Sequence, residues 1–251
     1  METRPVIKLE NLTKRYGTQT AVSNLNLEVK EGEIFGFLGP NGAGKTTTML
    51  MILGLTEPTS GTVRVFDSDP TREGLKVKKM IGYLPENVGF YDDMDAWGNL
   101  RYIARLNGIP DKTSAGRIES LLKDVDLAKE ADKKVGSYSK GMKQRLGIAE
   151  VLIKEPKIAF LDEPTIGLDP DGTNKMLDLI KNLSLERRMT IFFSSHLLDQ
   201  VQRISDRVGI MIAGNLVAAG PLAELAERGL GLREGEAYTL EEIYMKYFKE
   251  A

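Results

Sequence analysis

The sequence predicts an α/β protein with a parallel-sheet core, an antiparallel β flank and a helical insertion. In the middle of the chain, short β-branched and aromatic runs alternate with longer segments of helical period. Near the N-terminus, strand-like runs follow one another as in a hairpin. A chain of 251 residues can bury a sufficient core for one or two domains.

The expected elements follow from these runs, taken in order. The strands are expected at Val6–Glu10, Leu25–Val29, Ile34–Leu38, Thr62–Phe66, Met80–Leu84, Lys157–Leu161, Thr190–Ser194, Arg207–Ile212 and Leu216–Ala219. The helices are expected at Gly44–Leu53, Asp95–Asn107, Ser114–Val125, Lys140–Ile153 and Asn174–Leu185. The tract Ile34–Leu38 is apolar on both faces, which indicates a central strand covered on both sides.

The same patterns divide the chain. Strand signals vanish from about Asn87 to Val151, so a helical subdomain of about residues 87–153 is expected as an insertion in a domain of residues 1–220. A short helical extension should follow at 221–251, because Glu241–Phe248 carries apolar residues at helical spacing. The lysines of Lys76–Lys79 are read as a solvated face rather than a binding patch.

Composition excludes several classes of protein. The chain has no Cys and one His, so it can form neither a disulfide framework nor a thiolate metal site, and most zinc sites are excluded. With a net charge of −2, the chain lacks the overall positive charge that is typical of proteins that bind nucleic acid. No signal peptide is expected in Met1–Leu9, and Val208–Gly220 is too short and interrupted to span a membrane. A soluble protein of a reducing compartment is expected.

A phosphate-binding loop directly follows the apolar strand. It matches GxxxxGK(S/T) and consists of Gly39, Pro40, Asn41, Gly42, Ala43, Gly44, Lys45, Thr46 and Thr47. Its amides and the start of the next helix can enclose phosphates, Lys45 would reach the β- and γ-phosphates, and Thr46 would ligate Mg²⁺. The alternative is a glycine-rich turn that caps a helix.

Two carboxylates end a second apolar strand, Lys157–Leu161. We expect Asp162 to hold the Mg²⁺ shell from the tip of a strand beside the phosphate-loop strand, and Glu163 to polarise a water. The alternative is a pair of solvated acids. Together with the phosphate loop, these residues predict a P-loop NTPase core that hydrolyses ATP or GTP.

Several further motifs resemble those of ATP-binding cassette (ABC) ATPases. Ser137–Arg145 is similar to the family's signature loop, and the resemblance covers about residues 5–220. It implies that Ser139 and Gly141 contact a γ-phosphate. The remaining matches are Tyr16 at the position that stacks on adenine, Asp169 in a D-loop-like Gly167–Pro170, and His196 at the switch position.

The sequence departs from the family pattern at two places. Tyr138, Lys140 and Met142 replace the usual Leu, Gly and Gln of the signature, and Glu86 replaces the usual glutamine of the Q-loop. Glu86 can still ligate Mg²⁺ and couple the site to a partner. The alternative is that Glu86 is only an acidic residue on the surface of the loop. These departures and the tail at Leu240–Phe248 resemble the branch that serves ABC-2 type exporters.

Some of these residues also have simpler interpretations. Tyr occurs in loops for many reasons, so Tyr16 stacks on adenine chiefly if the resemblance holds. A lone histidine such as His196 is commonly a satisfied core residue. The tail aromatics Tyr244, Tyr247 and Phe248 are expected to dock on their own domain rather than on a partner.

The resemblance implies an ATPase that binds ATP and Mg²⁺ and pairs head-to-tail with a second copy or a homologous cassette. It would power an integral membrane permease, gripped near Asn87–Tyr91, from the cytoplasmic face of the membrane. One alternative is a soluble ABC ATPase of DNA repair or translation, which fits poorly with one cassette and only 117 residues between Lys45 and Asp162. A generic nucleotide switch or kinase would not explain the signature, D-loop and switch histidine together. The sequence does not specify the cargo.

Overall fold

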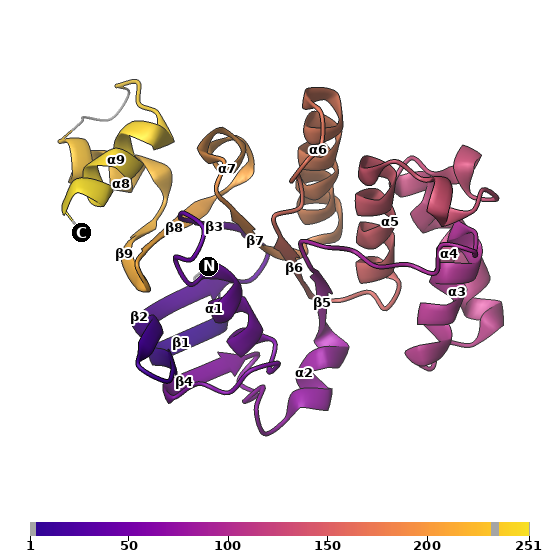
Figure 1. Cartoon of the computed structure of the whole chain (residues 1–251), viewed down its shortest axis with the longest axis horizontal. Helices are drawn as coiled ribbons and strands as arrows, with labels where there is room; N and C mark the ends of the chain where they lie inside the picture. The colour runs from indigo at the N-terminus through magenta and orange to yellow at the C-terminus, as the bar shows by residue number, and fades with distance from the viewer. Residues whose placement is uncertain (1–3, 232–235, 251) are drawn as a thin grey trace.

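A small antiparallel sheet forms the N-terminal flank of the molecule. The computed structural model describes residues 4–231 and 236–250. Strands β1 (Pro5–Tyr16), β2 (Gln19–Lys30) and β4 (Ser60–Val65) form an antiparallel sheet in the order β2-β1-β4 (Figure 1). The alternation of buried and exposed residues along β2 explains why it was recognisable as a strand.

A larger, mostly parallel sheet forms the core. Its strands are β3 (Ile34–Leu38), β5 (Ile81–Leu84), β6 (Ile158–Asp162), β7 (Thr190–Ser195), β8 (Arg207–Ile212) and β9 (Asn215–Gly220). Their order is β5-β6-β7-β3-β8-β9, with β9 antiparallel to β8 and the other pairs parallel. The predicted α/β class is confirmed.

One expectation about this sheet is wrong. Asp162 was expected on a strand next to the phosphate-loop strand β3, but β7 lies between β6 and β3. The chain leaves β6, crosses over through helix α6 (Pro170–Arg187) and returns as β7 in the space between the two strands. The parallel register places Asp162 beside Ser194, and Ser195 beside Leu38.

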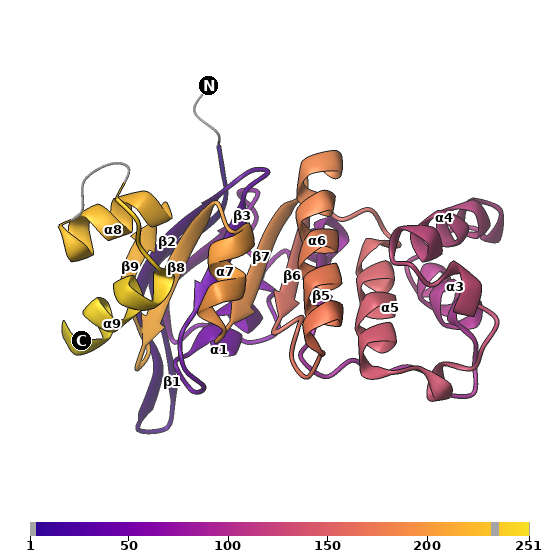
Figure 2. The ribbon, with the colours of Figure 1, turned by 90° about the horizontal axis from the view of Figure 1, so that it is seen from above.

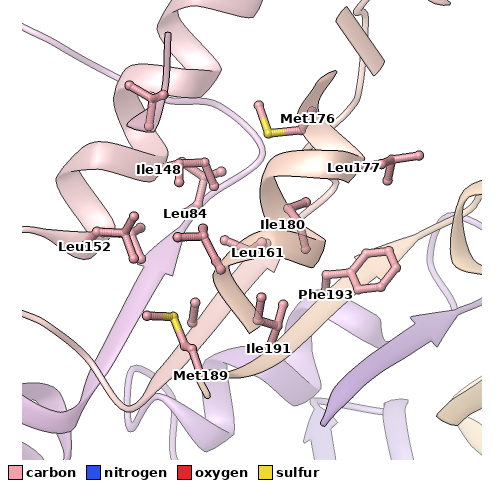
Figure 3. Packing of buried hydrophobic residues seen from close by; sticks show 14 of the residues in the cluster. Leu84, Ile148, Leu152, Leu161, Met176, Leu177, Ile180, Met189, Ile191 and Phe193 are labelled. Atoms are coloured by element: carbon pink, nitrogen blue, oxygen red, sulfur yellow. The ribbon is translucent and has the colours of Figure 1, made fainter. Parts of the chain in front are cut away.

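The core sheet is covered on both faces. All five residues of β3 are buried, as its apolar sequence predicts. Phe35 and Phe37 pack in the cluster that includes the antiparallel sheet and helix α1 (Lys45–Ile52). On the opposite face, helix α6 and helix α5 (Lys140–Leu152) cover the sheet with residues such as Ile180 and Ile148 (Figure 3).

Helices occupy the stretch that was predicted as an insertion. Helices α3 (Ala96–Leu106), α4 (Asp111–Asp124) and α5 lie together at one end of the molecule (Figure 2), and residues 87–153 contribute no strand to either sheet. Asp95 caps α3 by accepting a hydrogen bond from the Gly98 amide, which fixes the start of this segment. The boundaries of the domains stay a prediction.

Three helices were not predicted. They are α2 (Gly74–Met80), α7 (Leu198–Ile204) and α8 (Leu222–Leu230), of which α2 and α7 have only seven residues each. On α2, Val77 is buried whereas the three neighbouring lysines are exposed, in agreement with a solvated face.

The predicted tail helix is α9 (Leu240–Glu250), and residues 232–235 and 251 of the extension lie outside the described residues. Leu240 and Ile243 are fully buried, and α9 packs against α7 and α8. The tail therefore docks on its own chain. Among residues 4–231 and 236–250, none of the helices has the length and apolar composition needed to cross a membrane.

Candidate active site

The phosphate loop lies between β3 and α1 and forms one wall of a cleft of about 510 Å³. Gly44 has φ +101°, and a Cβ there would lie 2.4 Å from the Ala21 carbonyl oxygen, so this position requires glycine. The loop contributes Pro40, Asn41, Gly42, Ala43, Gly44, Lys45, Thr46 and Thr47 to the lining. The cleft is therefore built around the amides at the N-terminus of α1.

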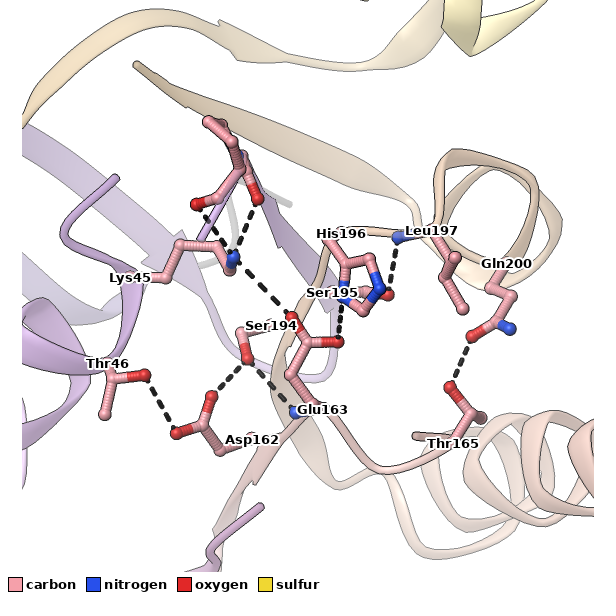
Figure 4. Close-up of polar contacts among 12 residues, drawn as sticks. Lys45, Thr46, Asp162, Glu163, Thr165, Ser194, Ser195, His196, Leu197 and Gln200 are labelled. Carbon is pink, nitrogen blue, oxygen red and sulfur yellow. Dashed lines mark hydrogen bonds and ion pairs between the residues drawn. The ribbon is translucent and has the colours of Figure 1, made fainter. Parts of the chain in front are cut away.

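Lys45 is held in this cleft by groups that phosphate oxygens could replace. Its side chain is 6% exposed, and Nζ donates to the Gly39 carbonyl at 2.7 Å and to the Pro40 carbonyl at 3.4 Å (Figure 4). The Glu163 carboxylate lies 3.6 Å away through Oε1, which is buried without a hydrogen-bond partner among the described residues. A buried ammonium beside an unsatisfied carboxylate oxygen marks a polar site in need of a ligand.

Thr46, Asp162 and Ser194 form a connected group across helix α1 and the two strands β6 and β7. Thr46 Oγ1 donates to Asp162 Oδ2 at 3.1 Å, and Ser194 Oγ donates to Asp162 Oδ1 at 2.5 Å. Ser194 Oγ also accepts the Glu163 amide at 3.2 Å. Ser194, on the intervening strand β7, thus links both carboxylate residues to the sheet.

The surroundings of Asp162 favour a cation. Burial, together with the Asp162 and Glu86 carboxylates, raises the pKa of the Tyr83 phenol to about 12, because these carboxylates disfavour another negative charge. Among the described residues, no three His, Asp or Glu side chains are grouped to hold a metal by themselves. Mg²⁺ usually takes one or two protein oxygens and completes its shell with phosphate and water. Thr46 and Asp162 would hold it, and Glu86 lines the same cleft.

Glu163 lines the cleft and contacts His196, which is not among the residues that line it. Glu163 has φ +49°, a left-handed conformation that costs about 1–2 kcal/mol for a residue with a side chain. Its Oε2 lies 2.9 Å from His196 Nδ1, and the His196 side chain is 36% exposed. The histidine is therefore a partly exposed residue that contacts Glu163, not a satisfied core residue.

Tyr16 also lines the cleft that contains the phosphate loop and Glu163. It ends β1 at the hairpin to β2, where it pairs with Gln19. Its side chain is 50% exposed, and Lys14 Nζ lies 4.9 Å from the ring centroid. A flat, accessible ring at this place can stack on a planar base.

A second cleft, of about 380 Å³, contains the other predicted phosphate contacts. It is lined by Ser139, Gly141 and Asp169, none of which lines the first cleft. Ser139 Oγ caps α5 by accepting the Met142 amide at 3.3 Å, and Asp169 Oδ1 caps α6 by accepting the Gly172 amide at 2.7 Å. The predicted site residues thus fall into two groups on one chain.

A family model described as ABC transporter matches residues 22–166, which is more than half of the chain. The chain belongs to the ABC transporter family. ABC ATP-binding domains bind ATP and hydrolyse it to power transport, so the chain is the ATP-binding, ATP-hydrolysing subunit of an ABC transporter. The predicted family and the predicted ATPase activity of a transporter subunit are confirmed.

Known relatives agree with this assignment. The chain is 45% identical to the bacitracin transport ATP-binding protein BcrA of Bacillus licheniformis over 89% of its own length and 72% of the relative's. It is 36% identical to the linearmycin resistance ATP-binding protein LnrL of Bacillus subtilis, over 89% of its own length and 71% of the relative's. A solved ATP-binding subunit of an ABC transporter superposes with a TM-score of 0.85 at 28% identity, covering 97% of this chain and 99% of that one.

A part of the nucleotide cleft was not predicted. One wall consists of residues from the β1–β2 hairpin and from the turn between β8 and β9: Gln19, Thr20, Ala21, Ala213 and Gly214. The Ser23 amide donates to the Gly214 carbonyl at 2.8 Å, which joins the two segments. These residues belong to no motif, and only the packing of β2 against β9 brings them to the site.

Proposed function

We propose that this chain is the ATPase subunit of an ABC-2 type exporter and works as a head-to-tail dimer. Its known relatives include proteins named for bacitracin transport, linearmycin resistance and Nod factor export. The soluble alternative in DNA repair or translation has no support among these relatives. The substituted signature and Q-loop and the tail helix agree with this branch.

The observation that carries the dimer is the separation of the two clefts. The phosphate loop lines one cleft, whereas Ser139, Gly141 and Asp169 line another. Two chains in head-to-tail arrangement would bring the second cleft of each chain over the first cleft of the other. A γ-phosphate would then contact both chains, so that its presence favours the closed pair and its loss favours opening.

In this arrangement each residue of the first cleft has a role. Lys45 would exchange the Gly39 carbonyl for phosphate oxygens, and Thr46, Asp162 and Glu86 would lie around Mg²⁺. When bound, ATP and Mg²⁺ supply the γ-phosphate and the charge that neutralises its oxygens. Glu163 would accept the proton of the attacking water, with His196 beside it near the γ-phosphate. Tyr16 would stack on the adenine.

The membrane partner would be an integral permease, contacted by the segment near Asn87–Tyr91. This segment connects the nucleotide cleft at Glu86 to the helical insertion, and Asn99 on α3 fixes it by accepting the Tyr91 amide at 2.9 Å. Closure of the dimer would move the permease between two access states. The chain would then lie at the cytoplasmic face of the membrane, attached through its partner.

The variant Glu163→Gln tests this proposal. It removes the proton acceptor but keeps the size of the side chain, so ATP hydrolysis should fall about 100-fold or more while Mg-ATP still binds. The trapped ATP should shift the variant from monomer to dimer in size-exclusion chromatography with light scattering. Hydrolysis at the parental rate would overturn the role of Glu163, and a monomer at saturating Mg-ATP would overturn the dimer.

A further inference from the structure

Gln200 makes a buried contact with the loop that carries the catalytic carboxylate. It lies on α7 and is 6% exposed, and its Oε1 accepts a hydrogen bond of 2.5 Å from Thr165 Oγ1 (Figure 4). Thr165 is 3% exposed. A hydrogen bond between two side chains that are both shielded from water holds its partners in a defined geometry.

Thr165 belongs to the loop of residues 163–169 that connects β6 to α6. This loop has two turns of its own, in which the Ile166 amide donates to the Glu163 carbonyl at 3.1 Å and the Leu168 amide to the Thr165 carbonyl at 3.2 Å. It starts with the left-handed backbone of Glu163 and ends with Asp169. A strained backbone of this kind persists only where the surrounding contacts determine it.

The segment that begins with His196 holds this loop at two points. His196 Nδ1 lies 2.9 Å from Glu163 Oε2, and Gln200, four residues later, holds Thr165. The first contact involves a partly exposed ring, whereas the second lies in the interior. The Thr165 contact is thus the one that water does not reach.

We propose that Gln200 is a positioning residue for ATP hydrolysis: by holding Thr165, it keeps the Glu163 carboxylate between Lys45 and His196. The inference rests on the proposed role of Glu163. Gln200 itself touches neither Lys45 nor Glu163 through any hydrogen bond of the described residues. Its effect is on the placement of the loop, and a small misplacement of a catalytic group costs a large factor in rate.

Two variants of nearly unchanged size remove the contact from either side. Gln200→Leu removes the acceptor and Thr165→Val removes the donor. Each should lower kcat for Mg-ATP hydrolysis about 10-fold or more and change KM less than about 3-fold, because the phosphate loop is untouched. The double variant should be no slower than the slower single variant, because both changes break one contact. Gln200→Glu keeps an acceptor oxygen and should recover most of the rate.

Gln202 provides a matched control on the same helix. Its Oε1 accepts the Leu240 amide at 2.8 Å, so it contacts the tail helix rather than the catalytic loop. Gln202→Leu should therefore keep kcat within about 2-fold of the parent. Thermal unfolding of every variant shows which are folded, and Thr165→Val tests the contact even if Gln200→Leu does not fold.

Any of three results would overturn the inference. The first is a folded Gln200→Leu or Thr165→Val variant with parental kcat. The second is a double variant whose fold decrease in kcat is the product of the two single decreases, and the third is a decrease in kcat for Gln202→Leu as large as that for Gln200→Leu. Glu163→Gln is measured in the same assay. If it hydrolyses ATP at the parental rate, the proposed function of Glu163 fails. If it is inactive while Gln200→Leu is fully active, only the inference about Gln200 fails.

Discussion

At the scale of single residues, the contact between His196 and Glu163 connects the switch position to the proposed base. His196 is the only histidine of the chain. Because Nδ1 faces Glu163 Oε2 at 2.9 Å, the ring can orient the carboxylate. His196 also lines a further cavity, separate from the two clefts described above, together with Gly39, Pro40 and Asn41 of the phosphate loop.

The variant His196→Ala should therefore affect hydrolysis more than binding. Removal of a preorganised group that faces developing charge lowers kcat by about 100-fold, whereas Lys45 and the loop amides still bind the phosphates. Steady-state ATPase assays and titration with a fluorescent ATP analogue measure the two effects. A parental kcat, or a loss of binding as large as the loss of rate, would contradict the role of His196.

The sequence predicted the residues of the phosphate cleft better than the contacts among them. Lys45 and Thr46 could be placed because the spacing of the glycines sets the local backbone. Thr165 and Gln200 are separated by 35 residues and belong to no motif, so only the tertiary fold brings them together. The role of Ser194 was missed for the same reason. No local sequence pattern predicts that β7 lies between β6 and β3.

At the scale of elements, the length and composition of each strand or helix decide whether the sequence predicted it. The apolar strands β3, β6 and β7 are recognisable because each is buried along its whole length. Helices α2 and α7 span only two turns, too little for a periodic pattern to show. Helix α8 falls within the predicted helical extension, and its own bounds were not predicted although Leu222, Leu225 and Ala226 recur at helical spacing.

Helix α5 carries a carboxylate that destabilises the fold when it is ionised. Burial raises the pKa of Glu150 above its ordinary value of 4.5, and no Lys or Arg among the described residues forms an ion pair with it. The unfolded chain therefore loses this proton at lower pH than the folded chain. As the pH rises through this range, ionisation favours the unfolded state, and the contribution of Glu150 to stability falls.

The variant Glu150→Gln should be more stable than the parent at pH 8, and this gain should shrink as the pH approaches 4.5. Urea unfolding at several pH values measures the difference in the free energy of unfolding. Glu119→Gln on α4 is the matched control, because Lys123 lowers the pKa of that carboxyl, and it should show no gain at pH 8. A gain for Glu150→Gln that does not depend on pH would contradict the burial argument.

At the scale of the whole molecule, the two clefts differ in charge. The nucleotide cleft is lined by the cation Lys45 and by the carboxylates of Glu86 and Glu163, so carboxylates are in excess there. The second cleft, which contains Ser139 and Gly141, is lined by the cations Lys140, Arg145 and Lys175 and by the carboxylates of Asp169 and Asp171, so cations are in excess there. The molecule therefore offers surfaces of opposite character to a second copy in the proposed head-to-tail arrangement.

Lys140 of the signature loop differs from the neighbouring lysines in its contacts. Its Nζ lies 2.5 Å from the position that a Cβ on Gly167 would take, so the side chain rests on a glycine at the start of the D-loop. Among the described residues no carboxylate pairs with it, whereas Lys143 pairs with Asp92 and Lys175 with Asp171. In a head-to-tail dimer this free ammonium would approach the phosphates and carboxylates of the other chain.

The charge of Lys140 should therefore strengthen the ATP-bound dimer. In the Glu163→Gln background, Lys140→Glu should raise the dimer dissociation constant at saturating Mg-ATP about 10-fold or more, since each dimer contains two copies of the contact. Added NaCl should weaken the Glu163→Gln dimer more than the dimer that also carries Lys140→Glu, because salt screens the positive charge that Lys140→Glu removes. Analytical ultracentrifugation measures both constants, and Lys112→Glu on the exposed face of α4 makes the same charge change away from the cleft. If Lys140→Glu and Lys112→Glu dimerise equally well, the lysine does not face the partner's nucleotide, and the signature contacts the γ-phosphate through Ser139 and Gly141 alone.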